Sequence, residues 1–210
     1  MNGELATALN ALASQTQLSL LHRPVSYFER LALTQLFEKD QPLEVDLGSG
    51  DGSFIVHYAQ LHPERNFIAV ERLLGRLRKI DRKGLRAQLT NLRLIRIEAS
   101  YFLEYLLPPE SAIAIHVYFP DPWPKRKHHK HRLVNPRFTD VARQALAPGG
   151  RIYLRTDDAD YFRQMACVWA ANRSFQPVET PAELLALSTD FERDFLARGI
   201  ATLRAAYQRV

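Results

Sequence analysis

The sequence predicts an α/β fold in which helices cover both faces of a mostly parallel sheet. Short apolar stretches that favour strands alternate along the chain with longer stretches that favour helices. Strand–helix–strand units at this spacing form right-handed crossovers, and such crossovers build parallel sheets. With 210 residues and 46% hydrophobic side chains, the chain is long enough for one sizeable core.

Seven stretches are predicted to be strands because they are short, apolar and bounded by Gly, Pro or charged residues. They are residues 43–47, 66–71, 92–98, 112–119, 151–156, 175–178 and 200–207. The predicted helices lie at residues 53–61, 73–89, 99–107, 136–147, 158–172 and from 181 onwards. Residues 1–40 are rich in Ala and Leu, and we expect them to form an N-terminal helical segment with a break near Pro24.

The composition limits where the protein acts. A bilayer-spanning helix needs about 20 apolar residues in a row, and the sequence contains no such run. Residues 1–14 carry no Lys or Arg and lack the apolar core of a secretory signal. Cys167 is the single cysteine, so neither a disulfide nor a cysteine-based zinc site is expected. We therefore expect a cytoplasmic protein that does not associate with membranes.

The net charge of +5 is concentrated in one segment. Residues 125–132 contain five Lys or Arg and three His, and the remaining basic residues balance the 23 acidic ones. A local basic cluster is the pattern expected where a protein binds a nucleic-acid backbone. A solvated loop is the alternative. The position favours binding, because the segment directly follows an apolar strand and three closely spaced prolines.

Five acidic residues are predicted to lie along one edge of the sheet. Each follows or ends a predicted strand: Asp46, Glu71, Glu98, Asp121 and Asp157. Ligands of parallel sheets bind outside the carboxyl ends of the strands. The strand ends alone therefore predict a binding site at this edge.

Three glycines, at positions 48, 50 and 52, follow the first predicted strand. Glycines there allow a tight turn and a close approach of the backbone to a ligand. A dinucleotide-binding pattern would need a glycine where Ser53 stands, and no Gly-Lys-Ser/Thr phosphate-binding loop is present. Asp46 would repel a pyrophosphate and attract a cation. S-adenosylmethionine carries an ammonium and a sulfonium and no phosphate, so it suits this loop better. A purely structural turn is the alternative.

Two strand-end acids suit an adenosine. Glu71 lies about twenty residues beyond the glycines, where a carboxylate can accept hydrogen bonds from ribose hydroxyls. This feature fits NAD and S-adenosylmethionine equally. Glu98 could accept a hydrogen bond from an adenine amino group, and an exposed acid without a ligand is an equal alternative.

The prolines at 120, 122 and 124 fix the backbone of the segment that carries Asp121 and Trp123. The indole of Trp123 either stacks on a flat substrate group or packs beneath the proline turn. The three histidines that follow share a basic loop without any cysteine, so they are poor metal ligands, and we expect no metal site.

Four segments together resemble the bacterial tRNA (guanine-N7)-methyltransferases. Phe-Pro-Asp-Pro-Trp-Pro-Lys-Arg-Lys-His at 119–128 is the most specific, and Asp-Leu-Gly-Ser-Gly-Asp-Gly at 46–52 is similar to the family's cofactor loop. Arg-Thr-Asp at 155–157 and Thr-Asp-Phe-Glu-Arg at 189–193 also resemble segments of this family. The resemblance runs from about residue 40 to the end of the chain.

The resemblance implies a Rossmann-like class I methyltransferase fold. Such a fold has a seven-stranded, mostly parallel sheet whose last strand is antiparallel, here in a domain over residues 41–210 after the helical segment 1–40. The implied reaction transfers the methyl group of S-adenosylmethionine to N7 of a guanosine in the variable loop of tRNA. This forms 7-methylguanosine without a metal. Both a monomer and a homodimer fit the family.

The resemblance also implies roles for individual residues. Asp121 is the implied catalytic residue. The implied cofactor contacts are Asp46, Gly48, Glu71, Glu98 and Asp121. The implied substrate contacts are Lys125, Asp157, Thr189, Asp190, Phe191 and Glu192. The implied RNA contacts are Lys127, His128, His129, Lys130, His131 and Arg132. Three positions depart from the family: Asp46 replaces Glu, Glu98 replaces Asp or Asn, and Asp190 replaces a frequent Lys.

Three alternatives remain at this point. An NAD-dependent oxidoreductase is disfavoured by Ser53 and Asp46, and no hydride-transfer residues are evident. A non-catalytic RNA-binding module would not need the set of Asp46, Glu71 and Asp121. A methyltransferase acting on another RNA or a small molecule would keep the chemistry and change the substrate.

Overall fold

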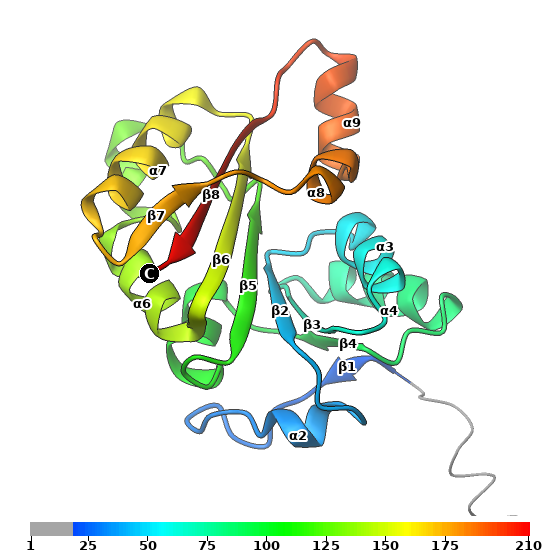
Figure 1. Ribbon diagram of the computed structural model, residues 1–210. Coiled ribbons are helices and arrows are strands. Elements are labelled where there is room, and N and C mark those ends of the chain that lie inside the picture. Colours follow the sequence, from blue (N-terminus) through cyan, green and yellow to red (C-terminus); the bar gives the residue numbers. More distant parts are fainter. Residues whose placement is uncertain (1–18) are drawn as a thin grey trace, which may run out of the picture.

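The computed structural model describes residues 19–210, and within them the sheet has eight strands in the order β1-β4-β3-β2-β5-β6-β8-β7 (Figure 1). The strands are β1 (Leu21–His22), β2 (Leu43–Leu47), β3 (Asn66–Val70), β4 (Leu92–Ile95), β5 (Ala112–Tyr118), β6 (Leu146–Thr156), β7 (Phe175–Val178) and β8 (Leu203–Arg209). All neighbours pair in parallel except β8, which is antiparallel to both β6 and β7. The predicted mostly parallel sheet with an antiparallel last strand is therefore confirmed.

The helices are α2 (Leu33–Leu36), α3 (Ser53–Leu61), α4 (Leu74–Arg86), α5 (Ala99–Tyr101), α6 (Pro136–Ala145), α7 (Ala159–Ala171), α8 (Ala182–Ala186) and α9 (Asp190–Ala197), with a π-helical turn η1 (Phe102–Leu106) and a 3-10 helix η2 (Arg126–His131). Two apolar clusters form the core. One joins the sheet to α6, α7 and η1, and the other joins it to α3, α4 and α8. Figure 1 shows α3 and α4 on one side of the sheet and α6 and α7 on the other.

The prediction of seven strands was wrong by one, because residues before 40 join the sheet. β1 pairs with β4, and the backbone oxygen of Leu20 accepts a hydrogen bond from the Leu94 amide at 2.9 Å. The Leu20 side chain is completely buried. Within residues 19–40 the helical prediction was also wrong, since only α2 is helical there. Residues 1–18 of that prediction lie outside the described residues.

Two further segments differ from the predictions. The helix expected from 181 onwards is two helices, α8 and α9, because Thr189 starts a new one. The Thr189 side chain accepts from the Glu192 amide, and the Glu192 carboxylate accepts from the Thr189 amide at 2.8 Å. The basic segment expected to be a loop forms η2 instead. No helix within residues 19–210 is long and apolar enough to cross a bilayer.

Candidate active site

Two adjoining cavities lie at the carboxyl ends of the parallel strands. The first, here called the α9-side cavity, has a volume of about 290 Å³ and includes Phe191 and Phe195 in its wall. The second, here called the η2-side cavity, has a volume of about 560 Å³ and includes Lys130 and His131. Both cavities share six wall residues: Gly48, Arg76, Tyr118, Phe119, Pro120 and Asp121. The two cavities therefore form one continuous site, with Asp121 at their junction.

The glycine loop between β2 and α3 has two separate structural roles. Gly48, Gly50 and Gly52 all have positive φ angles, of 77°, 58° and 79°. A Cβ added at Gly48 would meet no atom within 4 Å, so this position opens into the cavities. A Cβ at Gly52 would lie only 2.7 Å from Cγ1 of Ile80, so this glycine lets α3 and α4 pack closely. The loop thus leaves space for a ligand at Gly48 and holds the scaffold at Gly52.

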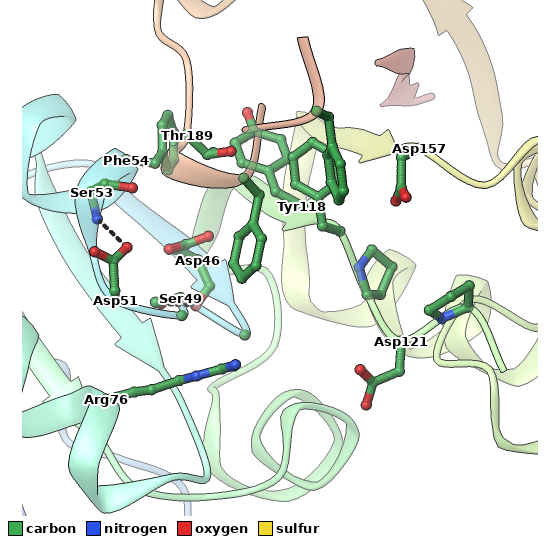
Figure 2. Close-up of a pocket in the computed structure, with 17 residues that line it drawn as sticks. Asp46, Ser49, Asp51, Ser53, Phe54, Arg76, Tyr118, Asp121, Asp157 and Thr189 are labelled. Carbon is green, nitrogen blue, oxygen red and sulfur yellow. Dashed lines mark hydrogen bonds between the residues drawn. The ribbon is translucent and has the colours of Figure 1, made fainter. Parts of the chain in front are cut away.

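Asp46 is a buried carboxyl group in the wall of the α9-side cavity (Figure 2). Its exposed fraction is 3%. Burial raises the pKa of Asp46 to about 6, although the nearby His116, Ser49 and Arg155 act in the opposite direction. A cation in the cavity would favour the ionised form of this group. The ionised fraction of Asp46, and with it the negative charge in the cavity, therefore rises with pH around 6.

Glu71 joins the glycine loop to the start of α4. Its carboxylate accepts hydrogen bonds from the Gly50 amide at 3.2 Å and the Leu73 amide at 2.8 Å. The guanidinium of Arg76 lies 3.6 Å from the same carboxylate. Glu71 is buried in the wall of the η2-side cavity, so it can both brace the loop and face a ligand.

Glu98 also lines the η2-side cavity, and its side chain already has a structural role. One carboxylate oxygen accepts a hydrogen bond from the Tyr101 amide at 2.8 Å and so caps α5. The side chain is exposed, which leaves the second oxygen open to solvent. The predicted adenine contact therefore competes with a helix cap.

Asp121 and Asp157 face the site from the ends of β5 and β6. Both lie in the wall of the α9-side cavity, and Figure 2 shows them on the side opposite Asp46 and Arg76. Within residues 19–210, neither side chain has a hydrogen-bonded protein partner. The turn that carries Asp121 is strained, because Phe119 and Trp123 have φ angles of 52° and 46°. The fold thus presents two carboxylates without partners in the described part of the chain.

Arg132 was predicted to contact RNA, and the structure places its side chain in the interior. The side chain is 2% exposed. Its guanidinium donates to the Pro122 backbone oxygen at 2.7 Å, to Gln164 at 2.8 Å and to Asp160 at 2.8 Å. The guanidinium also lies over the ring of Tyr161. Arg132 therefore fastens the proline turn to α7, and because it also lines the η2-side cavity, its contact with RNA stays a prediction.

The rest of the basic segment is divided between packing and solvent. Trp123 is 37% exposed, and the rings of His128 and His131 pack against it at centroid distances of 5.9 and 5.2 Å. His129 is half-buried, and its Nε2 lies 3.9 Å from Asp160. Five members are exposed to solvent: Lys125, Arg126, Lys127, Lys130 and His131. Of these five, only Lys130 and His131 line a cavity.

The segment 189–192 reaches the site through two residues only. Thr189 and Phe191 line the α9-side cavity. Glu192 is completely buried, and its carboxylate accepts from Arg155 at 2.6 Å and from Arg204 at 2.8 Å. Asp190 forms an ion pair with Arg193 and is not part of either cavity wall. Glu192 therefore anchors α9 and lies outside both cavity walls, and its substrate contact stays a prediction.

Some wall residues were not predicted from the sequence. Tyr118 and Phe54 form aromatic walls of the α9-side cavity, and the guanidinium of Arg155 lies 4.1 Å from the ring centroid of Tyr118. Arg76, in the first turns of α4, reaches both cavities. Its position at the start of a helix that follows the Glu71 strand end could have indicated this role. Among residues 19–210, no group of His, Cys, Asp or Glu is arranged to hold a metal ion.

Comparison with solved structures supports the fold. The 16S rRNA methyltransferase KamB superposes with a TM-score of 0.64 at 17% identity, covering 91% of this chain and 98% of that one. The 30S ribosomal A1408 methyltransferase from an uncultured bacterium has a TM-score of 0.62 at 15% identity, covering 90% and 96%. At these identities the likeness concerns the fold alone.

Sequence comparison gives closer relatives. A family model described as "Putative methyltransferase" matches residues 40–204. Proteins named tRNA (guanine-N(7)-)-methyltransferase from Syntrophotalea carbinolica and Halorhodospira halophila are 35% and 34% identical to this chain. The matches cover 78% and 80% of this chain and 72% and 74% of the relatives. A relative of the same name from a Nocardioides species is 39% identical, with 84% and 71% covered. The site lies within the matched residues, and the chain therefore belongs to the family of the bacterial tRNA (guanine-N7)-methyltransferases.

Proposed function

We propose that this protein transfers the methyl group of S-adenosylmethionine to N7 of a guanosine in the variable loop of tRNA, which forms 7-methylguanosine. The observation that carries the proposal is the position of Asp121, an exposed carboxylate at the junction of two cavities. The cofactor would span both cavities, with Asp46 in one wall and Glu71 in the other, and the base would lie in the α9-side cavity beside Asp157. The names of the relatives supply tRNA and N7 as the substrate and the atom.

The walls of the site suit S-adenosylmethionine. The open space above Gly48 is a cradle that any side chain would fill. Asp46 favours the cationic groups of this cofactor, and Glu71 favours its ribose hydroxyls. When bound, the cofactor supplies an electrophilic methyl group on a sulfonium. A nicotinamide dinucleotide fits less well, because its pyrophosphate would approach Asp46 and the loop lacks the third fingerprint glycine at Ser53.

The carboxylates of Asp121 and Asp157 suit a guanine. The N7 atom has a lone pair and no proton, so the chain needs no general base there. A guanine presents N–H donors on its opposite edge, and either carboxylate can accept from them. Methylation makes the purine cationic, and Asp121 would stabilise the developing positive charge without reorganisation. The aromatic side chains of Phe54, Tyr118 and Phe191 would exclude water from this region.

Exposed cations next to the site suit the RNA backbone. Lys127, Lys130 and His131 are open to solvent on η2, and Lys125 lies at its start. Phosphate contacts from such residues give affinity and orientation without reading the sequence. We further propose that residues 41–210 form the catalytic domain and that the protein works in the cytoplasm, as a monomer or a homodimer.

Reaction with bulk tRNA and methyl-labelled S-adenosylmethionine tests the proposed function directly. The labelled nucleotide is identified by digestion and mass spectrometry of the tRNA fragments. We expect a single labelled product, 7-methylguanosine in the variable loop. Label on another base, or transfer to RNAs other than tRNA in preference to tRNA, would contradict the proposal. The Asp121→Asn variant serves as the control for background labelling.

A further inference from the structure

The outer face of α4 is a second concentration of positive charge, separate from η2. Residues 72–86 contain seven Lys or Arg and a single acidic residue, Asp81. Acidic residues elsewhere in the chain balance the positive charge of this segment, so the net charge of +5 does not reveal it.

The fold turns the cations of α4 toward solvent. Leu77, Ile80 and Gly84 form its buried side, packed into the core. Arg76 is exposed beside the cavities, and the other exposed positions follow helical spacing along the opposite side: Gly75, Arg78, Lys79, Arg82 and Arg86. This face, which we call the α4 basic face, contains no exposed apolar side chain. With 13 residues the helix is about 20 Å long, so the face is an extended stripe.

Most of these cations have no acidic partner within residues 19–210. Lys83 pairs with Asp51 at 2.5 Å, and Arg76 lies 3.6 Å from Glu71. Asp81, the one acid of the segment, accepts hydrogen bonds from Ser19 and the Leu20 amide instead. No carboxylate in the described part of the chain lies within 4 Å of the remaining five: Arg72, Arg78, Lys79, Arg82 and Arg86. Like charges four residues apart destabilise a helix, so the repeated arginines at 78, 82 and 86 do not serve helix stability.

The α4 basic face is continuous with the candidate active site. Arg72 and Arg76, at the start of the helix, line the η2-side cavity together with Lys130 and His131. The two basic elements therefore border the same cavity from different parts of the chain. From this cavity the cations of α4 continue along the helix toward the amino ends of the strands.

We propose that the α4 basic face binds the sugar–phosphate backbone of the RNA substrate beside the target nucleotide, as a second contact region in addition to η2. This inference rests on the proposed function, since it concerns the same RNA. A membrane surface is disfavoured, because the apolar side of α4 is buried and cannot enter lipid. An acidic protein partner is disfavoured by the lack of exposed apolar side chains on the face. A phosphate backbone needs only spaced positive charges.

The test compares two variants that remove the same charge from different places. The α4 variant carries Arg78→Gln, Lys79→Gln and Arg82→Gln, none of which lines a cavity. Gln keeps a high helix propensity, so the helix should form. The matched control carries Lys39→Gln, Arg151→Gln and Arg173→Gln. All three are exposed cations; the first and last precede β2 and β7, and Arg151 lies in the middle of β6. The measurement is the dissociation constant for tRNA as a function of salt concentration, without turnover.

We expect the log–log salt dependence of the α4 variant to be less steep by about 2 to 3, and its affinity at 0.1 M salt to fall at least about tenfold. The control variant should match the wild type in slope. The KM for tRNA should rise with the affinity loss, while kcat at saturating tRNA and the dissociation constant for S-adenosylmethionine should stay unchanged. The single variant Arg82→Gln should lower the slope by about 1 and provides the test if the triple variant is poorly folded.

Two results would overturn the inference. Equal salt slopes for the α4 variant and the wild type would show that the face does not touch phosphates. A slope change shared with the control variant would show a general effect of net charge. Failure of the proposed function is a separate outcome, because it would appear as the absence of 7-methylguanosine from the wild-type reaction, whatever the salt slopes are.

Discussion

The two halves of the site are built in different ways. On the side of β2, β3 and β4, the predicted residues Asp46, Gly48, Glu71 and Glu98 all lie in cavity walls. On the side of β5, β6 and β8, two of the predicted contacts, Arg132 and Glu192, are buried and bonded to the scaffold. In the first half, strand ends and glycines place the functional groups. In the second half, two buried arginines hold the proline turn and the helix α9 over the site.

The proline turn and α9 do not pair with the sheet, so other contacts must hold them in position. Arg132 holds the proline turn through the backbone oxygen of Pro122, and Arg155 holds α9 through Glu192. Both segments contribute wall residues, among them Asp121 and Phe191. Buried charged residues therefore orient these walls, and of Arg132, Arg155 and Glu192 only Arg132 also lines a cavity.

The largest effect is expected from breaking the α9 anchor. Glu192→Ala leaves the buried guanidinium of Arg155 without its carboxylate, which should lower the free energy of unfolding by about 3–5 kcal/mol. Chemical denaturation measures this change. Asp194→Ala, an exposed acid on the same helix, is the control and should change stability by less than about 0.5 kcal/mol. A Glu192→Ala variant as stable as this control would show that the ion pair does not hold α9.

Removing the anchor of the proline turn should have the next largest effect. Arg132→Gln loses charge-assisted hydrogen bonds to Pro122 and Asp160, which should lower the free energy of unfolding by about 1.5–3 kcal/mol. We also expect kcat to fall, because the turn carries Asp121. Lys130→Gln is the control: it should keep the stability and reduce the salt slope of tRNA binding by about 1. If Arg132→Gln changed the salt slope and not the stability, Arg132 would be a phosphate contact after all.

On the other half of the site, a substitution of Gly48 should act mainly on the cofactor. Alanine would be strained at a φ of 77°, which should reduce stability by about 1–2 kcal/mol, and its Cβ would occupy the open space of the cavity. Calorimetry should show weaker binding of S-adenosylmethionine. Gly75→Ala, at an exposed helical position with room for a Cβ, should leave that binding unchanged and stabilise the protein slightly. Unchanged cofactor affinity in Gly48→Ala would place the cofactor elsewhere.

The smallest predicted effect is a pH dependence that arises from Asp46. With a pKa of about 6, this carboxyl group is mostly ionised at pH 7 and mostly protonated at pH 5. The affinity for S-adenosylmethionine should therefore fall by up to about tenfold between these values. In the absence of cofactor, the free energy of unfolding changes with pH in the opposite direction to the cofactor affinity. A carboxyl whose pKa is raised by folding contributes stability below its unfolded pKa, and this contribution is lost as the pH rises through about 6.

Asp46→Asn separates this pH dependence from that of other groups. The variant should bind the cofactor more weakly at pH 7 and show no change in affinity between pH 5 and pH 7. Calorimetric titrations at several pH values check both statements. If the variant kept the pH dependence of the wild type, another group would be responsible for it.

Much of the fold could be predicted because the strands are apolar and bounded by clear turn residues. Residues 43–47 and 53–61 form the predicted strand and helix with the predicted bounds. The strand β1 was missed because two residues carry no periodicity. The division into α8 and α9 was missed although the sequence contains its signal, the capping-box pattern Thr-x-x-Glu at 189–192.

The positions of strand-end residues could be predicted from backbone geometry, whereas the direction in which a side chain points could not. The carboxyl ends of parallel strands must meet at one edge, so Asp46 and Glu71 could be placed together. A run of charges does not reveal which member points inward, so Arg132 could not be told from Lys130. The spacing of the cations on α4 was visible in the sequence, but their position at the cavity depends on how the helix packs.

If Asp121 acts on the base at the junction of the two cavities, its negative charge should control the rate of methyl transfer. The most direct test is the single-turnover rate of tRNA methylation by Asp121→Asn, measured together with its affinity for S-adenosylmethionine. We predict that the rate falls by about 10²-fold or more, since a charge that stabilises the transition state is lost, while the cofactor still binds. A single-turnover rate close to that of the wild type would contradict the account.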